Sequence, residues 1–215
     1  MNLLTQNRKM KKSKDKRTFN FGIPAYKDKV GNKTCPNAAA CIVGCYANAG
    51  AYMFSNVKSA FEARLKATKQ NNFAELIQLE LDKKRVERLR IHDSGDFYSL
   101  EYTMKWFEVM KANPSIHFYA YTKMVSMFKV LTLAGHIPSN FTLIYSFGGT
   151  QDKLIDKNTD RHSMVFETHK ERKIAKYSNT TEDDRHAVGL NIRVGLVYHG
   201  AKLYKNTTWN KVIVK

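Results

Sequence analysis

The feature that most constrains the fold is a regular alternation of strand and helix patterns between residues 88 and 149. Short runs rich in apolar and aromatic residues have the composition of strands. Two longer segments between them place apolar side chains at helical spacing. One of these helices begins after Ser99, a preferred helix-capping residue. Such alternation builds a parallel sheet through right-handed crossovers, so we expect an α/β fold. The predicted strands are residues 88–92, 116–121 and 141–147, and the predicted helices are 99–110 and 124–133.

The flanking segments carry weaker patterns. Two helices are predicted before the alternation, at residues 57–65 and 73–81, with Ser55 or Asn56 as the cap of the first. Past residue 150 the chain is more polar, and the number of strands is low for a closed barrel. Strands are predicted there at residues 164–167, 190–198 and 209–214, and loops at 151–163 and 178–186.

All three cysteines of the chain lie in one loop rich in glycine and alanine. Cys35, Cys41 and Cys45 have the spacing C-x5-C-x3-C, and no other position of the 215 is a cysteine. An odd number of cysteines argues against a disulfide framework. Three cysteines scattered through a core would be ordinary small apolar residues, but their clustering favours a metal site.

Two kinds of metal site remain open. Structural zinc needs four ligands and usually a C-x2-4-C knuckle, which this loop lacks. A histidine such as His92 would have to supply the fourth ligand. Iron–sulfur clusters are held by thiolates. A cubane bound by three cysteines leaves one iron with an open position for a small molecule. The cysteine pattern favours the cluster, and it leaves open a [4Fe–4S] and a [3Fe–4S] form.

The chain is strongly basic, with 36 Lys and Arg against 19 Asp and Glu, a net charge of +17. This balance indicates nucleic acid or an acidic protein, such as an electron donor, as partner. Solubility alone is the other explanation. Ten of the basic residues lie in residues 1–33, where residues 7–17 are predicted to be a mobile, solvated arm. No apolar run reaches the roughly 18 residues of a membrane helix, and no secretory signal is visible, so we expect a cytoplasmic protein without a membrane partner.

Small or polar residues follow three of the predicted strands. In parallel sheets, ligands bind beyond the carboxyl ends of the strands. These segments are therefore expected to line a pocket, although each alone is also compatible with an ordinary turn. They are Ser94, Gly95 and Asp96 after the first strand, Lys123 after the second, and Ser146, Gly148 and Gly149 after the third.

These residues and the cysteine loop together resemble the phage gene product 88 family. The resemblance covers roughly the first 150 residues and implies a phage-encoded protein acting in the host cytoplasm. Its most specific parts are the cysteine loop and the Ile-His-Asp-Ser-Gly-Asp-Phe segment at residues 91–97. The remaining matches lie at residues 3–7, Thr-Cys-Pro at 34–36, Gly-Cys-Tyr-Ala at 44–47 and Phe-Tyr-Ala-Tyr-Thr-Lys at 118–123.

That family in turn looks like a reduced relative of the radical S-adenosylmethionine enzymes. Those enzymes carry three cysteines, usually C-x3-C-x2-C, after the first strand of a partial (β/α) barrel. The resemblance implies a partial barrel-like parallel sheet, with Cys35, Cys41 and Cys45 as the ligands of a [4Fe–4S] cluster. It also implies that S-adenosylmethionine binds the open iron. Asp96, or the backbone around Gly95, would take the amino group of this cofactor. Further contacts are implied for Ser94, Tyr46, Tyr119, Tyr121, Lys123, Ser146, Gly148 and Gly149.

The sequence departs from the enzyme pattern in three ways. The cysteine spacing differs, Asp96 is shorter than the glutamate of the enzymes' Gly-Gly-Glu segment, and no cysteine follows Cys45 for an auxiliary cluster. Whether the chain is an enzyme therefore stays open. A non-enzymatic iron–sulfur protein that binds nucleic acid or a host protein is the second reading, and a zinc module is the third. The expected organisation is a basic arm and lead-in at 1–33 followed by one α/β iron–sulfur domain at 34–215.

Overall fold

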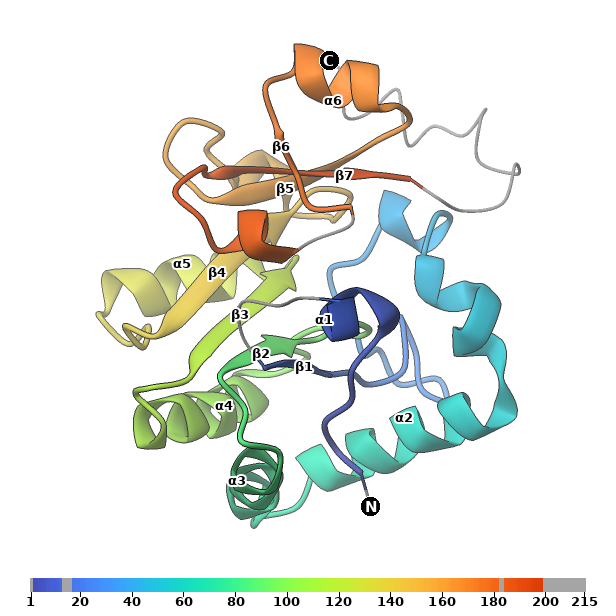
Figure 1. Cartoon of the computed structure of the whole chain (residues 1–215), viewed down its shortest axis with the longest axis vertical. Coiled ribbons are helices and arrows are strands. Elements are labelled where there is room, and N and C mark those ends of the chain that lie inside the picture. The colour runs from blue at the N-terminus through green and yellow to red at the C-terminus, as the bar shows by residue number, and fades with distance from the viewer. Residues whose placement is uncertain (1, 13–16, 182–183, 199–215) are drawn as a thin grey trace.

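The computed structural model describes residues 2–12, 17–181 and 184–198. Within these residues, seven strands form one sheet in the order β1-β2-β3-β4-β5-β7-β6, and every pair of neighbours is parallel. The sheet curls into a half-barrel (Figure 1), which confirms the predicted α/β class and partial-barrel architecture. The strands are β1 (Thr18–Phe21), β2 (Arg88–Ile91), β3 (His117–Thr122), β4 (Phe141–Ser146), β5 (His162–Phe166), β6 (Ser178–Asn179) and β7 (Arg193–Val197). The helices are α1 (Arg8–Lys12), α2 (Ser55–Thr68), α3 (Phe73–Lys84), α4 (Leu100–Ala112), α5 (Val125–Leu133) and α6 (His169–Ile174).

The convex face of the sheet carries the main hydrophobic core. Side chains alternate between the two faces of a strand, and those that point outward from β1, β2 and β3 pack against α3, α4 and α5 (Figure 1). Trp106 of α4 is fully buried and meets the rings of Phe21 and Phe73 edge to face, with ring centres 5.2 and 5.3 Å away. Aromatic packing of this kind contributes beyond the apolar area it buries.

The concave face of the same strands is polar. Asn20 of β1, Arg90 of β2 and Tyr119 of β3 lie side by side in register across the sheet. All three are at least nine-tenths buried. Buried polar groups need partners, so this face must be covered by other polar elements. The 3-10 helix η5 (Asp184–Ala187) and helix α1 supply them.

Most of the predicted elements are present, with shifted ends. The five helices and strands predicted between residues 88 and 149 correspond to β2, α4, β3, α5 and β4, and the two upstream helices are α2 and α3. The Ser99 hydroxyl accepts a hydrogen bond from the Tyr102 amide and caps α4 as expected. The predicted cap of α2 is wrong, because Phe54 precedes this helix and no side chain caps it. The predicted strand at 209–214 lies outside the described residues.

The beginning of the chain corrects one expectation. Residues 7–17 were expected to form a mobile, solvated arm, but residues 8–12 form α1, and Met10 is 2% exposed. Strand β1, which was not predicted, follows and pairs with β2. The proposed domain boundary after residue 33 stays a prediction, although β1 lies before it and belongs to the sheet. In the described part of the chain, no helix combines the length and apolar character needed to cross a membrane.

Candidate functional site

The cysteine loop follows β1 and is held against the carboxyl ends of the neighbouring strands. The Cys41 amide donates a hydrogen bond of 3.1 Å to the Gly148 carbonyl after β4, and the Ala39 amide donates to the same oxygen at 3.2 Å. The Thr150 amide donates to the Asn37 carbonyl at 2.9 Å. The loop is therefore fixed by backbone bonds that do not depend on which side chains it carries.

The Asp96 carboxylate joins the end of β2 to the end of β3. Its Oδ1 accepts a hydrogen bond of 2.6 Å from the Thr122 hydroxyl, and its Oδ2 accepts one of 2.9 Å from the Lys123 amide. The Asp96 amide donates to the Thr34 carbonyl at 2.9 Å, next to Cys35. Burial raises the pKa of Asp96 although these bonds oppose the rise. Both carboxylate oxygens are thus already engaged within the protein.

Two glycines permit the close packing of this edge. Gly95 has a φ of 85°, and a Cβ at this position would come within 2.2 Å of the Ile23 side chain. A Cβ at Gly149 would lie 2.8 Å from the Asn37 carbonyl oxygen of the cysteine loop. Any larger residue would therefore push the loop away from the strands. The groups that pack closely against these two glycines are therefore Ile23 and the Asn37 carbonyl of the protein itself.

The three thiols lie half-buried in the same region. The Tyr26 amide donates a hydrogen bond of 3.3 Å to Cys35 Sγ. Burial, together with the charge of Asp96, raises the pKa of Cys35 to about 12, and burial also raises the pKa of Cys45. The ammonium of Lys123 opposes both shifts. It is held by the Ser146 hydroxyl at 3.0 Å, so one fixed positive charge lies close to two of the thiols.

His92, the candidate fourth zinc ligand, lies elsewhere. Its Nε2 is 2.9 Å from the Tyr102 hydroxyl, and its ring packs edge to face on Phe97 with centres 4.5 Å apart. Burial lowers the pKa of His92 to about 3, so the imidazole is neutral. Among the described residues, no three side chains of His, Cys, Asp or Glu are grouped to hold a single metal ion.

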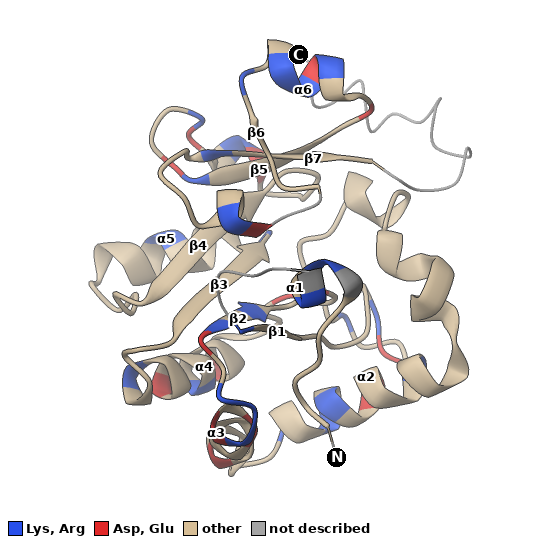
Figure 2. Cartoon of the chain, in the orientation of Figure 1, with Lys and Arg blue, Asp and Glu red and all other residues tan. Residues whose placement is uncertain are grey.

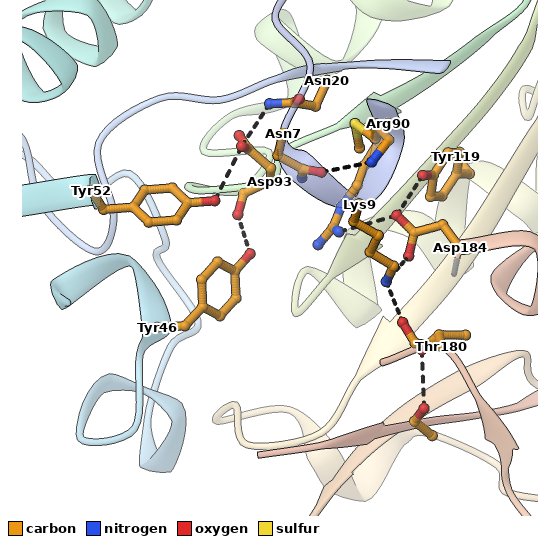
Figure 3. Close-up of polar contacts among 12 residues, drawn as sticks. Asn7, Lys9, Asn20, Tyr46, Tyr52, Arg90, Asp93, Tyr119, Thr180 and Asp184 are labelled. Atoms are coloured by element: carbon orange, nitrogen blue, oxygen red, sulfur yellow. Dashed lines mark hydrogen bonds and ion pairs between the residues drawn. The ribbon is translucent and has the colours of Figure 1, made fainter. Parts of the chain in front are cut away.

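Next to the cysteine loop, Asp93 is the centre of a buried polar cluster. Its Oδ2 accepts hydrogen bonds from Asn20 Nδ2 at 2.6 Å and from the Tyr52 hydroxyl at 3.3 Å. The Tyr46 hydroxyl donates to the Asp93 carbonyl (Figure 3). Asp93 Oδ1 is buried without a hydrogen-bond partner in the described residues, against Gly22, where a Cβ would lie within 2.0 Å of it. Burial raises the pKa of Asp93 to about 6, although Arg90 and Arg64 lower it.

This raised pKa predicts a pH dependence of stability. The folded pKa of about 6 lies above the ordinary value of about 3.9, so the folded protein favours the protonated form of Asp93. The stabilisation that the protonated Asp93 gives to the folded state is therefore complete below pH 4 and is lost as the pH rises through 6. The free energy of unfolding falls by up to about 3 kcal/mol over this range. Asp93→Asn should flatten this part of the profile, measured by urea unfolding between pH 4 and 7. Asp82→Asn, an exposed control, should not change it, and equal slopes in Asp93→Asn and the unsubstituted chain would contradict the prediction.

A second cluster fills the concave face around Asp184 of η5. Its carboxylate pairs with Lys9 Nζ of α1 at 2.6 Å and with Arg90 at 3.4 Å, and it accepts a hydrogen bond of 2.8 Å from the Tyr119 hydroxyl. Lys9 also donates to the Thr180 carbonyl (Figure 3). Burial alone would raise the pKa of Asp184, but the charges of Arg90 and Lys9 outweigh it and hold that pKa below its usual value.

The structure thus brings most of the predicted site residues to one edge. Ser94, Gly95, Asp96, Lys123, Ser146, Gly148 and Gly149 lie at adjoining strand ends beside Cys35, Cys41 and Cys45. Tyr46 reaches the Asp93 cluster instead. The Tyr121 ring lies on the concave face with the Arg90 guanidinium 4.9 Å from its centre.

The chain was compared with known protein families and with curated proteins. The family model described as "Gene product 88" matches residues 1–210. The chain belongs to the phage gene product 88 family. A curated relative, the "Gene 88 protein" of Mycobacterium phage L5, is 26% identical over an alignment of 144 residues, and the match covers 54% of this chain and 59% of the relative. The match thus spans less than two thirds of that relative's length. No solved structure matches the chain.

The charged residues that fill the concave face of this gene product 88 protein were not predicted as site residues, unlike the tyrosines of β3 that lie among them. Arg88 and Arg90 alternate within a short apolar strand, and that spacing was a usable signal for a polar inner face. Asp184 lies in a segment predicted as a polar loop and gave no such signal. Its partners Lys9 and Arg90 are 175 and 94 residues away along the chain.

Proposed function

We propose that this protein holds a [4Fe–4S] cluster through Cys35, Cys41 and Cys45 and binds S-adenosylmethionine at the iron that no cysteine ligates. The observation that carries the proposal is the position of the three thiols. They lie on one loop that backbone bonds fix to the carboxyl edge of a parallel half-barrel. Ligands bind at this edge in parallel α/β sheets.

The donor set suits a cluster better than a single ion. A mononuclear zinc site needs four ligands gathered closely around one atom, and the described residues offer no such group. A cubane is wider than one ion and takes its thiolates from farther apart. The Tyr26 amide on Cys35 Sγ supports this reading, because hydrogen bonds to ligand sulfur tune the potential of such clusters.

The neighbouring residues would control charge and position. When bound and reduced, a cluster held by the three cysteines would supply one electron for the cleavage of a carbon–sulfur bond of S-adenosylmethionine. Lys123 would offset the negative charge of the thiolates at Cys35 and Cys45, and the Ser146 hydroxyl holds its ammonium in place. Asp96 would act as a positioning residue, since its carboxylate already binds Thr122 and the Lys123 amide.

The cofactor contacts are proposed for the groups that remain at this edge. With the Asp96 carboxylate engaged, the backbone around Gly95 is the better candidate for the cofactor's amino group. Ser94, Gly148 and Gly149 border the same edge and would line the rest of the site. Tyr46 directly follows the last cysteine, and Tyr121 lies deeper on the concave face, where adenosine or substrate would be placed.

Electron paramagnetic resonance of anaerobically purified, dithionite-reduced protein tests the proposal, with and without S-adenosylmethionine. We expect a cubane signal that shifts when the cofactor is added, because binding at the open iron changes its coordination. A cubane signal that does not move would reject cofactor binding and leave a non-enzymatic iron–sulfur protein. Absence of an iron signal, with zinc in the same sample, would reject the cluster itself.

A further inference from the structure

A second concave region lies beside the cysteine loop and shares only Ser94 with the residues assigned to the proposed cluster and cofactor site. It is a groove of about 830 Å³ between helix α2 and the loops at residues 24–30 and 47–53. Ser94, at the end of β2, also lines it. The groove therefore reaches the turn that carries Gly95 and Asp96, and whatever it binds would lie next to the candidate site.

The lining of this groove is strongly basic. Five lysines line it, and Figure 2 shows basic positions along α2. The groove lysines are Lys27, Lys29, Lys58, Lys66 and Lys69. None of the five forms an ion pair with another residue of the described segments. Their charges are therefore available to an anionic partner.

The two acidic residues of the lining are already engaged by the protein. Asp28 accepts hydrogen bonds from the Val30 and Asn32 amides at 3.0 and 2.8 Å. Glu62 accepts one of 2.8 Å from the Lys29 amide. Both carboxylates thus stabilise the loop that forms one wall of the groove. Both keep their negative charges, and the charge of Asp28 interacts with that of Lys69. Five lysines against two carboxylates still leave the groove lining with an excess of positive charge.

Apolar and aromatic groups accompany these charges. Tyr52 lines the groove with its ring 5.7 Å from that of Phe61, which is buried beneath it, and Val30 and Met53 are 73% and 47% exposed on the groove walls. The Ser94 hydroxyl is buried and has no hydrogen-bond partner in the described residues. Aromatic and apolar side chains beside lysines are the combination that binds single-stranded nucleic acid, where bases stack and phosphates pair with cations.

We propose that this groove binds single-stranded nucleic acid, with its phosphates on the groove lysines and its bases against the apolar wall. An acidic protein would use the same charges, and competition by an acidic polypeptide distinguishes it from a nucleic acid. Duplex nucleic acid hides its bases and would contact only the rim. The proposal does not depend on iron, because none of the groove lysines lies in the cysteine loop between residues 35 and 45.

Fluorescence anisotropy with a labelled oligothymidylate of about 15 nucleotides tests the proposal, using the full chain over a range of salt concentrations. The triple variant Lys58→Ala/Lys66→Ala/Lys69→Ala removes three groove charges. We expect the Kd at 0.1 M salt to rise about tenfold or more and the slope of log K against log salt to fall by about 2. The matched control Lys111→Ala/Lys153→Ala/Lys173→Ala removes three exposed lysines outside the groove lining and should change both values little.

Three results would overturn the proposal. The first is an equal loss of affinity for the oligonucleotide in the two triple variants, which would mean that net charge alone drives binding. The second is binding of a duplex of the same length at least as tightly as the single strand. The third is displacement of the oligonucleotide by polyglutamate at equal charge concentration. Iron and sulfide are measured on every sample, so absence of the cluster is distinguished from absence of nucleic-acid binding in the groove.

Discussion

Replacing Cys41 by alanine is expected to abolish the bound iron and acid-labile sulfide and, with them, the brown colour of the protein. The proposed cluster has three protein ligands, and a thiolate cannot be replaced by a methyl group. The backbone of Cys41 would still donate to the Gly148 carbonyl, so the loop should keep its position. The expected change is from about four iron atoms per chain to nearly none.

Iron and sulfide analysis together with the absorption spectrum measures this effect on anaerobically purified protein. Val43→Ala, in the same loop and 54% exposed, is the matched control and should keep the full complement. Circular dichroism checks that both variants fold. A Cys41→Ala protein with unchanged iron and sulfide would show that the ligand set is wrong.

Asp184→Ala is expected to lower the free energy of unfolding by about 3–5 kcal/mol. The substitution removes the carboxylate that Lys9 and Arg90 share, and removing one partner from a buried ion pair has a cost of this size. It also removes the acceptor of the Tyr119 hydroxyl. Asp184→Asn keeps an oxygen for Tyr119 but loses the charge, so it should be intermediate.

Urea unfolding at neutral pH measures the effect. Glu101→Ala is the control. It breaks the ion pair with Lys105, but Glu101 is 81% exposed, and such exposed pairs contribute at most about 1 kcal/mol to the free energy of unfolding.

The folded pKa of Asp184 is below its unfolded value. Its contribution is therefore present above the unfolded pKa and is lost as the pH falls through the folded pKa. A loss in Asp184→Ala no larger than that in Glu101→Ala would refute the role of this cluster.

The class of fold and the middle of the sheet were predictable because they depend on local periodicity. Apolar positions repeat at strand spacing in β2, β3 and β4 and at helix spacing in the helices between them. This spacing is a local property of the sequence and does not depend on the rest of the chain. Strand β1 was missed because its four residues follow a run of lysines and arginines, and the charge pattern outweighed a short strand signal.

The candidate site was predictable only in outline. Parallel strands place their carboxyl ends at one edge, so segments that follow β2, β3 and β4 were expected to meet there. The engagement of both Asp96 oxygens by Thr122 and Lys123 was not foreseen. This engagement depends on how the ends of β2 and β3 pack against each other. Because of it, the Asp96 carboxylate links the two strands and is no longer a candidate contact to a ligand.

By itself, the sequence determined the alternating α/β order, the clustering of every cysteine in one loop and the basic character of the chain. These are properties of composition and spacing. Only the tertiary structure decided which groups fill the concave face and which lysines gather around one groove. Lys9, Arg90 and Asp184 meet across 94 to 175 residues of chain. Contacts of that kind follow from the curl of the sheet and the packing of distant segments, which leave no local pattern to read.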